Sequence, residues 1–243
     1  MKKSGFIKYL VLRTIGNFLL LFALFGVLAT FGPALYYEAQ YQVMQYRGVK
    51  YKVASAEETS GFKKILESEK INKKSEIKTE VSFSTVITGP KEQVLIPIDT
   101  NFSILIPKIG ANAKVFPNVD PANQDIFLPI LQQGVAHAKG TVFPGMNGNI
   151  YLFAHSTDNF WDVGRYNAIF YLLKNLQEGD NVIVFFEDRR YNYVITKLGV
   201  AEASDISYLV KSQDQIKETL ILQTCWPPGT TWKRLLIFAE RKK

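Results

Sequence analysis

The pattern of hydrophobic and polar positions divides the chain into three stretches that differ in composition and periodicity. The first is an uncharged apolar run from Thr14 to Tyr37. The second, Lys50 to Glu80, is rich in Lys and Glu and has only weak periodicity. The third begins at about Val94, where short β-rich runs alternate with turn residues. The pattern predicts a membrane-compatible segment, a polar spacer and a β-rich domain, in that order.

The third stretch predicts a mainly β fold. Its runs are short and turn residues separate them, which is typical of an antiparallel barrel or sandwich. The predicted strands are Phe102–Ile109, Lys114–Phe116, Ile126–Leu131, Asn149–Ala154, Asn181–Phe186, Arg190–Val200, Leu220–Thr224 and Arg234–Ala239. Glu187 and Asp188, between two of these runs, are expected to form a hairpin turn. Two stretches have helical spacing of apolar residues instead, Trp161–Leu176 and a shorter one at about Ser207–Ser212.

The uncharged run is long enough to cross a bilayer. As a helix that rises about 1.5 Å per residue, residues 14–37 would span roughly 36 Å, against a hydrocarbon core of about 30 Å. A cleaved signal peptide is the alternative, but its apolar region would be shorter and would end in small residues. Four basic residues and no acidic one precede the run. This asymmetry favours a cytoplasmic N-terminus, with the rest of the chain outside the membrane.

The charge pattern argues against nucleic-acid binding. The chain carries a net charge of +7, of which +4 lies in residues 1–13. The rest of the chain carries 25 basic and 22 acidic side chains, so the body is close to balanced. A phosphate-binding face would need Lys and Arg clustered in that body. We therefore expect membrane association but no nucleic-acid partner.

Cys225 is the one cysteine in the sequence and ends the apolar run TLILQTC. The segment WPPGTTW follows and must turn, and the next run, RLLIFAE, begins at Arg234. A hairpin of this kind would place a thiol and a guanidinium side by side. A lone cysteine can also be a buried apolar residue or the site of a crosslink between chains.

Two histidines are available to such a thiol. His155 follows the run NIYLFA at the exit of a predicted strand, whereas His137 lies in GVAHAKGTVFPG. A thiolate is a nucleophile, and a neighbouring cation favours its formation. A histidine can protonate a leaving amine, and an arginine can stabilise an oxyanion. Cys, His and Arg thus suffice for acyl transfer, without a metal or other cofactor.

Several blocks, in order, resemble the sortases, a family of membrane-anchored cysteine transpeptidases of bacterial surfaces. They are SILIPKIGANAKV from Ser103, GVAH at 134–137, PGMNGNIYLFAHS at 144–156, LQTC at 222–225, and Arg234. The resemblance covers roughly Ser103 to Glu240. In much of the family a threonine stands four residues before the cysteine, where this chain has Ile221. Similarly, Ala154 replaces a common glycine before the histidine.

The resemblance implies a closed β-barrel of about eight strands with one or two short helices, preceded by the transmembrane helix. It implies Cys225 as nucleophile, His155 as proton donor and Arg234 as substrate clamp and oxyanion stabiliser. The expected domains are a cytoplasmic tail at 1–13, a transmembrane anchor at 14–37, an extracytoplasmic stalk at 38–94 and a catalytic domain at 95–243. The protein would then be a single-pass protein of the plasma membrane.

The implied partners are surface proteins with a C-terminal sorting motif and an amine acceptor on a cell-wall precursor or another protein. No cofactor is expected. Calcium is possible but not indicated, because the spacing of Asp99, Asp120, Asp125 and Asp158 fits no calcium-loop motif. Two alternatives to a transpeptidase stay open at this point. One is a hydrolase that uses the same three residues, and the other is a non-catalytic, membrane-tethered scaffold barrel.

Overall fold

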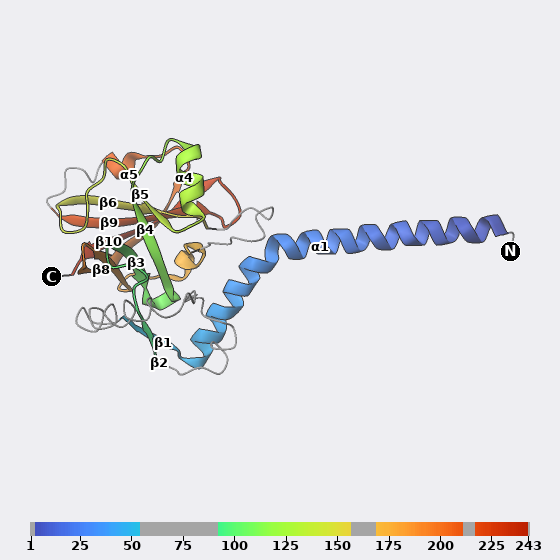
Figure 1. The fold of residues 1–243 in the computed structure, drawn as a ribbon, viewed down its shortest axis with the longest axis horizontal. Helices are drawn as coiled ribbons and strands as arrows, with labels where there is room; N and C mark the ends of the chain where they lie inside the picture. Colours follow the sequence, from blue (N-terminus) through green and yellow to red (C-terminus); the bar gives the residue numbers. More distant parts are fainter. Residues whose placement is uncertain (1–2, 54–91, 157–168, 211–216, 243) are drawn as a thin grey trace, which may run out of the picture.

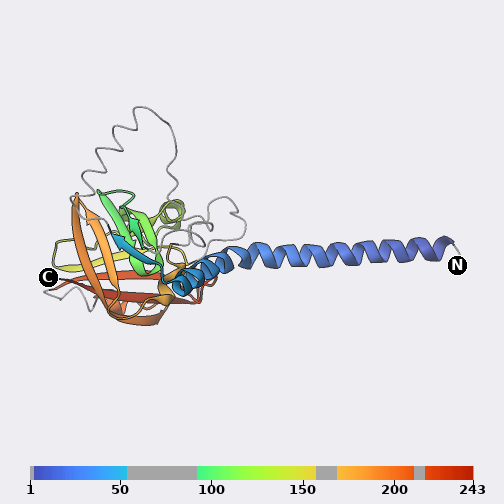
Figure 2. The same cartoon turned by 90° about the horizontal axis from the view of Figure 1, so that it is seen from below.

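The computed structural model describes residues 3–53, 92–156, 169–210 and 217–242. A β-barrel forms the body of the protein, and the helix α1 (Lys3–Arg47) projects from one side of it (Figures 1 and 2). Within the described residues the barrel has eight strands and closes on itself in the order β10-β8-β7-β3-β4-β5-β6-β9. The strands are β3 (Phe102–Ile106), β4 (Ala111–Val119), β5 (Val135–Ala138), β6 (Gly148–Phe153), β7 (Asn181–Phe186), β8 (Arg189–Glu202), β9 (Glu218–Trp226) and β10 (Lys233–Arg241).

The barrel confirms the predicted fold class, with a mixed rather than purely antiparallel sheet. The pairs β4–β5 and β6–β9 are parallel, and the other neighbours are antiparallel. Side chains alternate between a core inside the barrel and a second apolar layer on its outer face. On β9, for example, Leu220 and Leu222 belong to the inner core and Ile221 to the outer layer. This alternation decides which side chains can reach a site outside the barrel.

The segment predicted as a strand at Ile126–Leu131 is a helix, α4 (Gln124–Leu131). The side chain of Asn123 caps it by accepting a hydrogen bond from the backbone N–H of Asp125, at 3.0 Å. Phe127, Ile130 and Leu131 share one helical face and pack on the outer apolar layer. The short apolar run was therefore helical in period, and the prediction of a strand was wrong.

Two further differences from the sequence prediction concern β3 and β5. The strand predicted to Ile109 ends at Ile106, because Pro107 opens the 3-10 turn η1 (Pro107–Ile109). Strand β5 was not predicted. Gly134, just before it, approaches β4 so closely that a Cβ there would overlap the carbonyl oxygen of Lys114. The glycine of the GVAH block is therefore needed to bring these two strands together.

The predicted turn and helices are found where the structure describes them. Glu187 and Asp188 form the two-residue turn between β7 and β8, both with positive φ, as a tight hairpin of this kind requires. The helix predicted at 161–176 lies partly outside the described residues. Its described end is the 3-10 helix η2 (Tyr171–Asn175). Helix α5 (Ser207–Val210) matches the start of the other predicted helix.

Helix α1 continues from an apolar segment onto the barrel. Its stretch Gly5–Ala29 is long and apolar enough to cross a membrane, which is consistent with the predicted single-pass anchor. The helix bends before it reaches the barrel (Figure 1). There Tyr41 and Met44 are buried in the core cluster that also contains the side chains of η2. The carboxylate of Glu38 lies 2.8 Å from the Lys174 ammonium, and this hydrogen bond holds the pKa of Glu38 below its ordinary value.

Two short strands follow α1 beside the barrel. Strand β1 (Lys50–Val53) pairs in parallel with β2 (Glu92–Leu95), and Leu95 is buried against Leu105 and Ile183. The hydroxyl of Tyr51 donates to the sulfur of Met44, at 3.1 Å. The described parts of residues 38–94 thus pack on the barrel. This packing limits how freely the barrel can move relative to α1.

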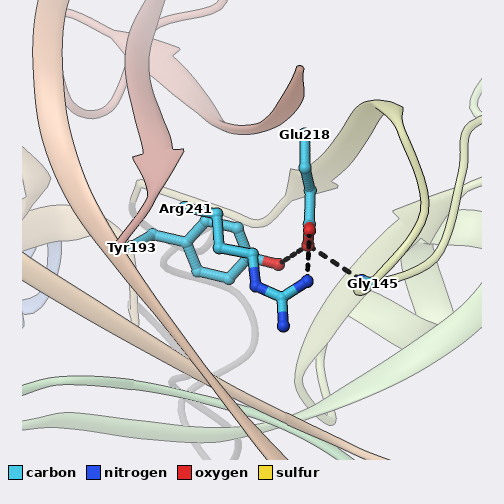
Figure 3. Close-up of polar contacts among 4 residues, drawn as sticks. All are labelled: Gly145, Tyr193, Glu218 and Arg241. Carbon is cyan, nitrogen blue, oxygen red and sulfur yellow. Dashed lines mark hydrogen bonds and ion pairs between the residues drawn. The ribbon is translucent and has the colours of Figure 1, made fainter. Parts of the chain in front are cut away.

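A buried carboxylate, that of Glu218 at the start of β9, connects several segments at one end of the barrel. Glu218 accepts hydrogen bonds from the backbone N–H of Gly145 (2.8 Å), the hydroxyl of Tyr193 (2.5 Å) and the guanidinium of Arg241 (2.8 Å), as Figure 3 shows. Its side chain is 6% exposed, whereas that of Arg241 is 43% exposed. One carboxylate therefore joins β8, β9, β10 and the loop before β6. Arg241 is used in this contact and is not available to the thiol.

We predict that Glu218→Gln lowers the free energy of unfolding by about 1.5–3 kcal/mol, since it weakens hydrogen bonds to a charged group. Urea unfolding followed by tryptophan fluorescence measures the change. Glu240→Gln is the matched control on the neighbouring strand, because the Glu240 carboxylate forms a long, solvent-exposed ion pair with Lys217, at 3.5 Å. That control is expected to cost less than about 0.5 kcal/mol. Equal effects of the two substitutions would contradict the role given to Glu218.

Candidate active site

Cys225 and Arg234 face each other across a hairpin. They are paired residues in the antiparallel ladder of β9 and β10, and Nη1 of Arg234 lies 3.7 Å from Sγ of Cys225. The same Nη1 donates to the carbonyl oxygens of Thr231 (3.1 Å) and Lys233 (3.2 Å). The loop backbone thus holds the guanidinium against the sulfur. The predicted neighbourhood of thiol and guanidinium is present in the structure.

Strand β6, on the other side of β9 from β10, brings His155 close to Cys225. Strand β6 runs parallel to β9, with Phe153 opposite Gln223. Two residues farther along each segment, this register places His155 beside Cys225. The ladder continues past Phe153, since the N–H of Ala154 donates to the carbonyl of Gln223 (3.2 Å) and the hydroxyl of Thr224 donates to the carbonyl of Ala154 (3.0 Å). A buried threonine hydroxyl therefore anchors the residue before His155.

His155, Cys225 and Arg234 all line one cleft of about 950 Å³ on the outer face of the barrel. Alternate residues of β6, Asn149, Tyr151 and Phe153, line part of it, and His155 continues this row just beyond the strand. Helix α4 supplies an apolar wall with Phe127 among its residues, and Tyr208 of α5 lies on the side of β9. The cleft is thus elongated along β6, apolar on one side, and carries its three reactive groups together at one end.

A polar cluster that the sequence analysis missed lies next to the thiol. Gln223, two residues before Cys225 on the same face of β9, accepts hydrogen bonds from the hydroxyls of Tyr151 and Tyr208. Burial raises the pKa of Tyr151, so its hydroxyl stays protonated and remains a donor. Period-two spacing from Cys225 would have assigned Gln223 to the cleft. No sequence pattern, however, connects it with the two tyrosines.

A family model for the sortase domain matches residues 104–242, more than half of the chain. The chain belongs to the sortase family. Sortase D of Bacillus subtilis (strain 168) is 29% identical to this sortase over 139 residues, which make up 56% of this chain and 61% of that protein. The match thus spans less than two thirds of the length of that relative.

Solved sortase structures resemble the fold of this sortase. Sortase C-1 from Actinomyces oris is 24% identical, with a TM-score of 0.50 over 60% of this chain and 76% of that one. The lid mutant of sortase A from Corynebacterium diphtheriae is 18% identical, with a TM-score of 0.49 over 87% of this chain and 95% of that one. The first of these likenesses, together with the closed barrel, supports the fold predicted from the motif blocks.

The aspartates considered for calcium do not gather in the described part of the chain. Asp99 pairs with Lys114 at 3.3 Å, and Asp120 accepts from the backbone of Ala122. Asp158 lies outside the described residues. Within those residues no group of three or more His, Cys, Asp or Glu side chains is placed to hold a metal ion. The expectation that no cofactor is needed stays a prediction.

His137, the other histidine, is buried inside the barrel and does not line the cleft. Its Nδ1 accepts from the N–H of Asn118 (3.3 Å), so the proton of the neutral ring is on Nε2, which faces the carbonyl of Val142 (3.1 Å). The ring stacks on Phe143, with centroids 4.6 Å apart. The hydroxyl of Thr141 also lies 3.0 Å from Nε2, so both ring nitrogens contact neighbouring polar groups of the barrel, and we expect a structural role for this histidine.

Burial lowers the pKa of His137 below its ordinary value. Below a pH of about 6.5 the unfolded chain takes up a proton that the folded chain does not, so stability is complete above that pH and is lost as the pH falls. We predict that the free energy of unfolding decreases from pH 7 to pH 5 by up to about 1.4 kcal/mol per pH unit from this group.

The variant His137→Gln isolates the contribution of this ring from that of the carboxyl groups. It should be less stable than the wild type at pH 7, and the difference between the two should shrink as the pH falls to 5. Urea unfolding at several pH values measures both. Two parallel curves would show that the ring does not titrate on unfolding.

Proposed function

We propose that this sortase is a cysteine transpeptidase whose catalytic residues are Cys225, His155 and Arg234. The observation that carries the proposal is the convergence of the three side chains at one end of a peptide-sized cleft, with the guanidinium 3.7 Å from the sulfur. A thiolate at this position has a fixed cation beside it. A carbonyl that binds over the sulfur would lie within reach of the same guanidinium.

The proposed reaction has two steps. In the first, Sγ of Cys225 attacks a backbone carbonyl of the donor peptide, and the negative charge that develops on the oxygen is stabilised by Arg234. His155 then donates a proton to the nitrogen of the departing amine as the C–N bond breaks, which leaves a thioester on Cys225. In the second step, an acceptor amine attacks the thioester, loses a proton to His155, and releases the thiolate. Water as the acceptor would give hydrolysis instead.

The proposed partners follow from the family. The donor would be a surface protein with a C-terminal sorting motif, and the acceptor an amine on a cell-wall precursor or another protein. The basic residues before the apolar part of α1 favour a cytoplasmic N-terminus, so the barrel would lie on the extracytoplasmic side of the plasma membrane. Donor, acceptor and enzyme would then meet at the outer surface of that membrane.

The function is tested with the full chain in detergent, incubated with a library of sorting-motif peptides and an excess of an amine such as hydroxylamine or triglycine. Mass spectrometry follows the thioester and the products. The proposal expects an adduct on Cys225 and amine-capped peptide in excess over free acid, and neither product from Cys225→Ala. Free acid as the main product would favour the hydrolase alternative. Peptide binding without any adduct would favour the scaffold.

We predict that Arg234→Lys lowers kcat by about 10²- to 10³-fold, because a point charge cannot keep both loop carbonyls and also reach the oxyanion. The rate of amine-capped product formation measures the loss. Arg189→Lys, the same change at an exposed hairpin position outside the cleft, should keep the full rate. Full activity in Arg234→Lys would remove the arginine from the mechanism and leave the cysteine and histidine in place.

A further inference from the structure

The docked end of α1 and the reactive end of the barrel are the same end. Strands β6 and β9 run in parallel and both end there, with His155 just past the end of β6 and Cys225 near the end of β9. Strand β3 runs in the same direction as β6, because β4 and β5 between them run the opposite way. The turn η1, which follows β3, and η2, which precedes β7, therefore lie at this end as well. Helix α1 contacts η2, so the anchor helix docks at the end of the barrel that carries the reactive groups.

Very little chain separates the membrane-compatible part of α1 from this contact. The uncharged run ends at Tyr37, and the next residue, Glu38, already pairs with Lys174 of η2 at 2.8 Å. Even from Ala29, where the stretch long enough to cross a membrane ends, the helix to Glu38 is only roughly 14 Å long. The polar layer of a bilayer is itself about 5–8 Å thick on each side. With α1 in the membrane, the docked end of the barrel would therefore face the bilayer surface. Both views show the β9–β10 loop on the side of the barrel from which α1 projects (Figures 1 and 2).

The loop between β9 and β10, residues 227–232, carries no charged side chain. Trp226, before it, packs against the barrel core, whereas Trp232 at its end is 72% exposed. Tryptophan is enriched at membrane–water interfaces, where its ring contacts apolar groups and its N–H finds a polar partner. A single exposed apolar side chain is common on soluble proteins. The placement of Trp232 at the end of the barrel that would face the membrane is therefore what gives its exposure a meaning.

Hydrogen bonds hold this loop and connect it to the site. The backbone N–H and the hydroxyl of Thr230 both donate to the carbonyl oxygen of Pro227, at 3.0 and 2.8 Å. The guanidinium of Arg234 donates to the carbonyl of Thr231, the residue before Trp232, at 3.1 Å. A loop that is already ordered loses little conformational entropy when it binds. Contact of Trp232 with lipid would therefore need little rearrangement, and it would act on the loop that also holds Arg234.

We propose that Trp232 lies in the headgroup layer of the membrane, so that the β9–β10 loop forms a second membrane contact in addition to the anchor helix. Two contacts, one through the bilayer and one on its surface, would fix the orientation of the barrel, with the reactive end of the cleft next to the lipid headgroups. The partner is the bilayer interface and not a protein or peptide. This inference rests on α1 as a membrane anchor and is independent of the proposed reaction.

The test uses the full chain in phosphatidylcholine vesicles whose acyl chains carry bromine near the headgroup, where it quenches tryptophan fluorescence at short range. The three tryptophans of the sequence, Trp161, Trp226 and Trp232, all lie outside α1, so quenching reports only how closely the rest of the chain approaches the lipid. Relative to vesicles without bromine, the wild type should lose emission, and in Trp232→Phe this loss should be at least about two-fold smaller. Cys225→Ala, measured without any peptide, should match the wild type, which separates this test from that of the proposed function.

A double variant tests the orientation of the barrel. Met146 is 54% exposed in the loop before β6, at the opposite end of the barrel, where Gly145 contacts Glu218. Adding Met146→Trp to Trp232→Phe restores the number of tryptophans but places the new ring away from the membrane, so the quenched fraction should be no higher than in Trp232→Phe alone. Equal quenching in the wild type and Trp232→Phe would show that the loop does not touch lipid. Recovery of wild-type quenching by Met146→Trp would show that the barrel has no fixed orientation, and either result overturns the inference.

Discussion

The backbone ladder of β9 is the interaction on which the site depends. This strand is hydrogen-bonded to β6 on one side, in parallel, and to β10 on the other, antiparallel. Its register sets rows of outward side chains, in which Tyr151, Phe153 and His155 lie level with Ile221, Gln223 and Cys225. Because strand side chains alternate, a slip of one residue would turn the thiol into the barrel and a core leucine out. The catalytic geometry is therefore determined by the same hydrogen bonds that close the barrel.

The two ends of β9 have different tasks, and their polar groups differ accordingly. At its start, Glu218 uses both carboxylate oxygens on partners from three other segments, which satisfies a buried charge and fixes the strand in register. At its other end, the polar groups of Gln223, Cys225 and Arg234 are only half-buried and line the cleft. The reactive groups at the cleft end of β9 have little packing around them to fix their positions. The firm attachment of the strand at its other end helps to keep them in place.

Much of this arrangement could be predicted from the sequence, and the exceptions have physical reasons. The hairpin of Cys225 and Arg234 was predictable because both residues border one turn, and local contacts are encoded locally. The position of His155 in the site was predicted from its motif alone. No local sequence pattern shows that the strand before it pairs in parallel with β9, which is distant in the sequence. The helix α4 was mistaken for a strand because a short apolar run fits either period. The contact between Gln223, Tyr151 and Tyr208 could not be predicted, because it depends on how α5 is packed over the sheet.

The passage of α1 onto the barrel bears on how such an enzyme could meet its substrates. A polar stretch alone would suggest a loose tether, yet Tyr41 and Met44 are buried in the barrel core and Glu38 pairs with Lys174. Burial of two large side chains contributes roughly 1.5–3 kcal/mol each, enough to keep the helix docked for most of the time. With Gly5–Ala29 in the membrane, as proposed, a docked helix would hold the cleft at a restricted height above it. That restriction would favour donors and acceptors that are themselves attached to the membrane, because their reactive groups also lie within a narrow layer.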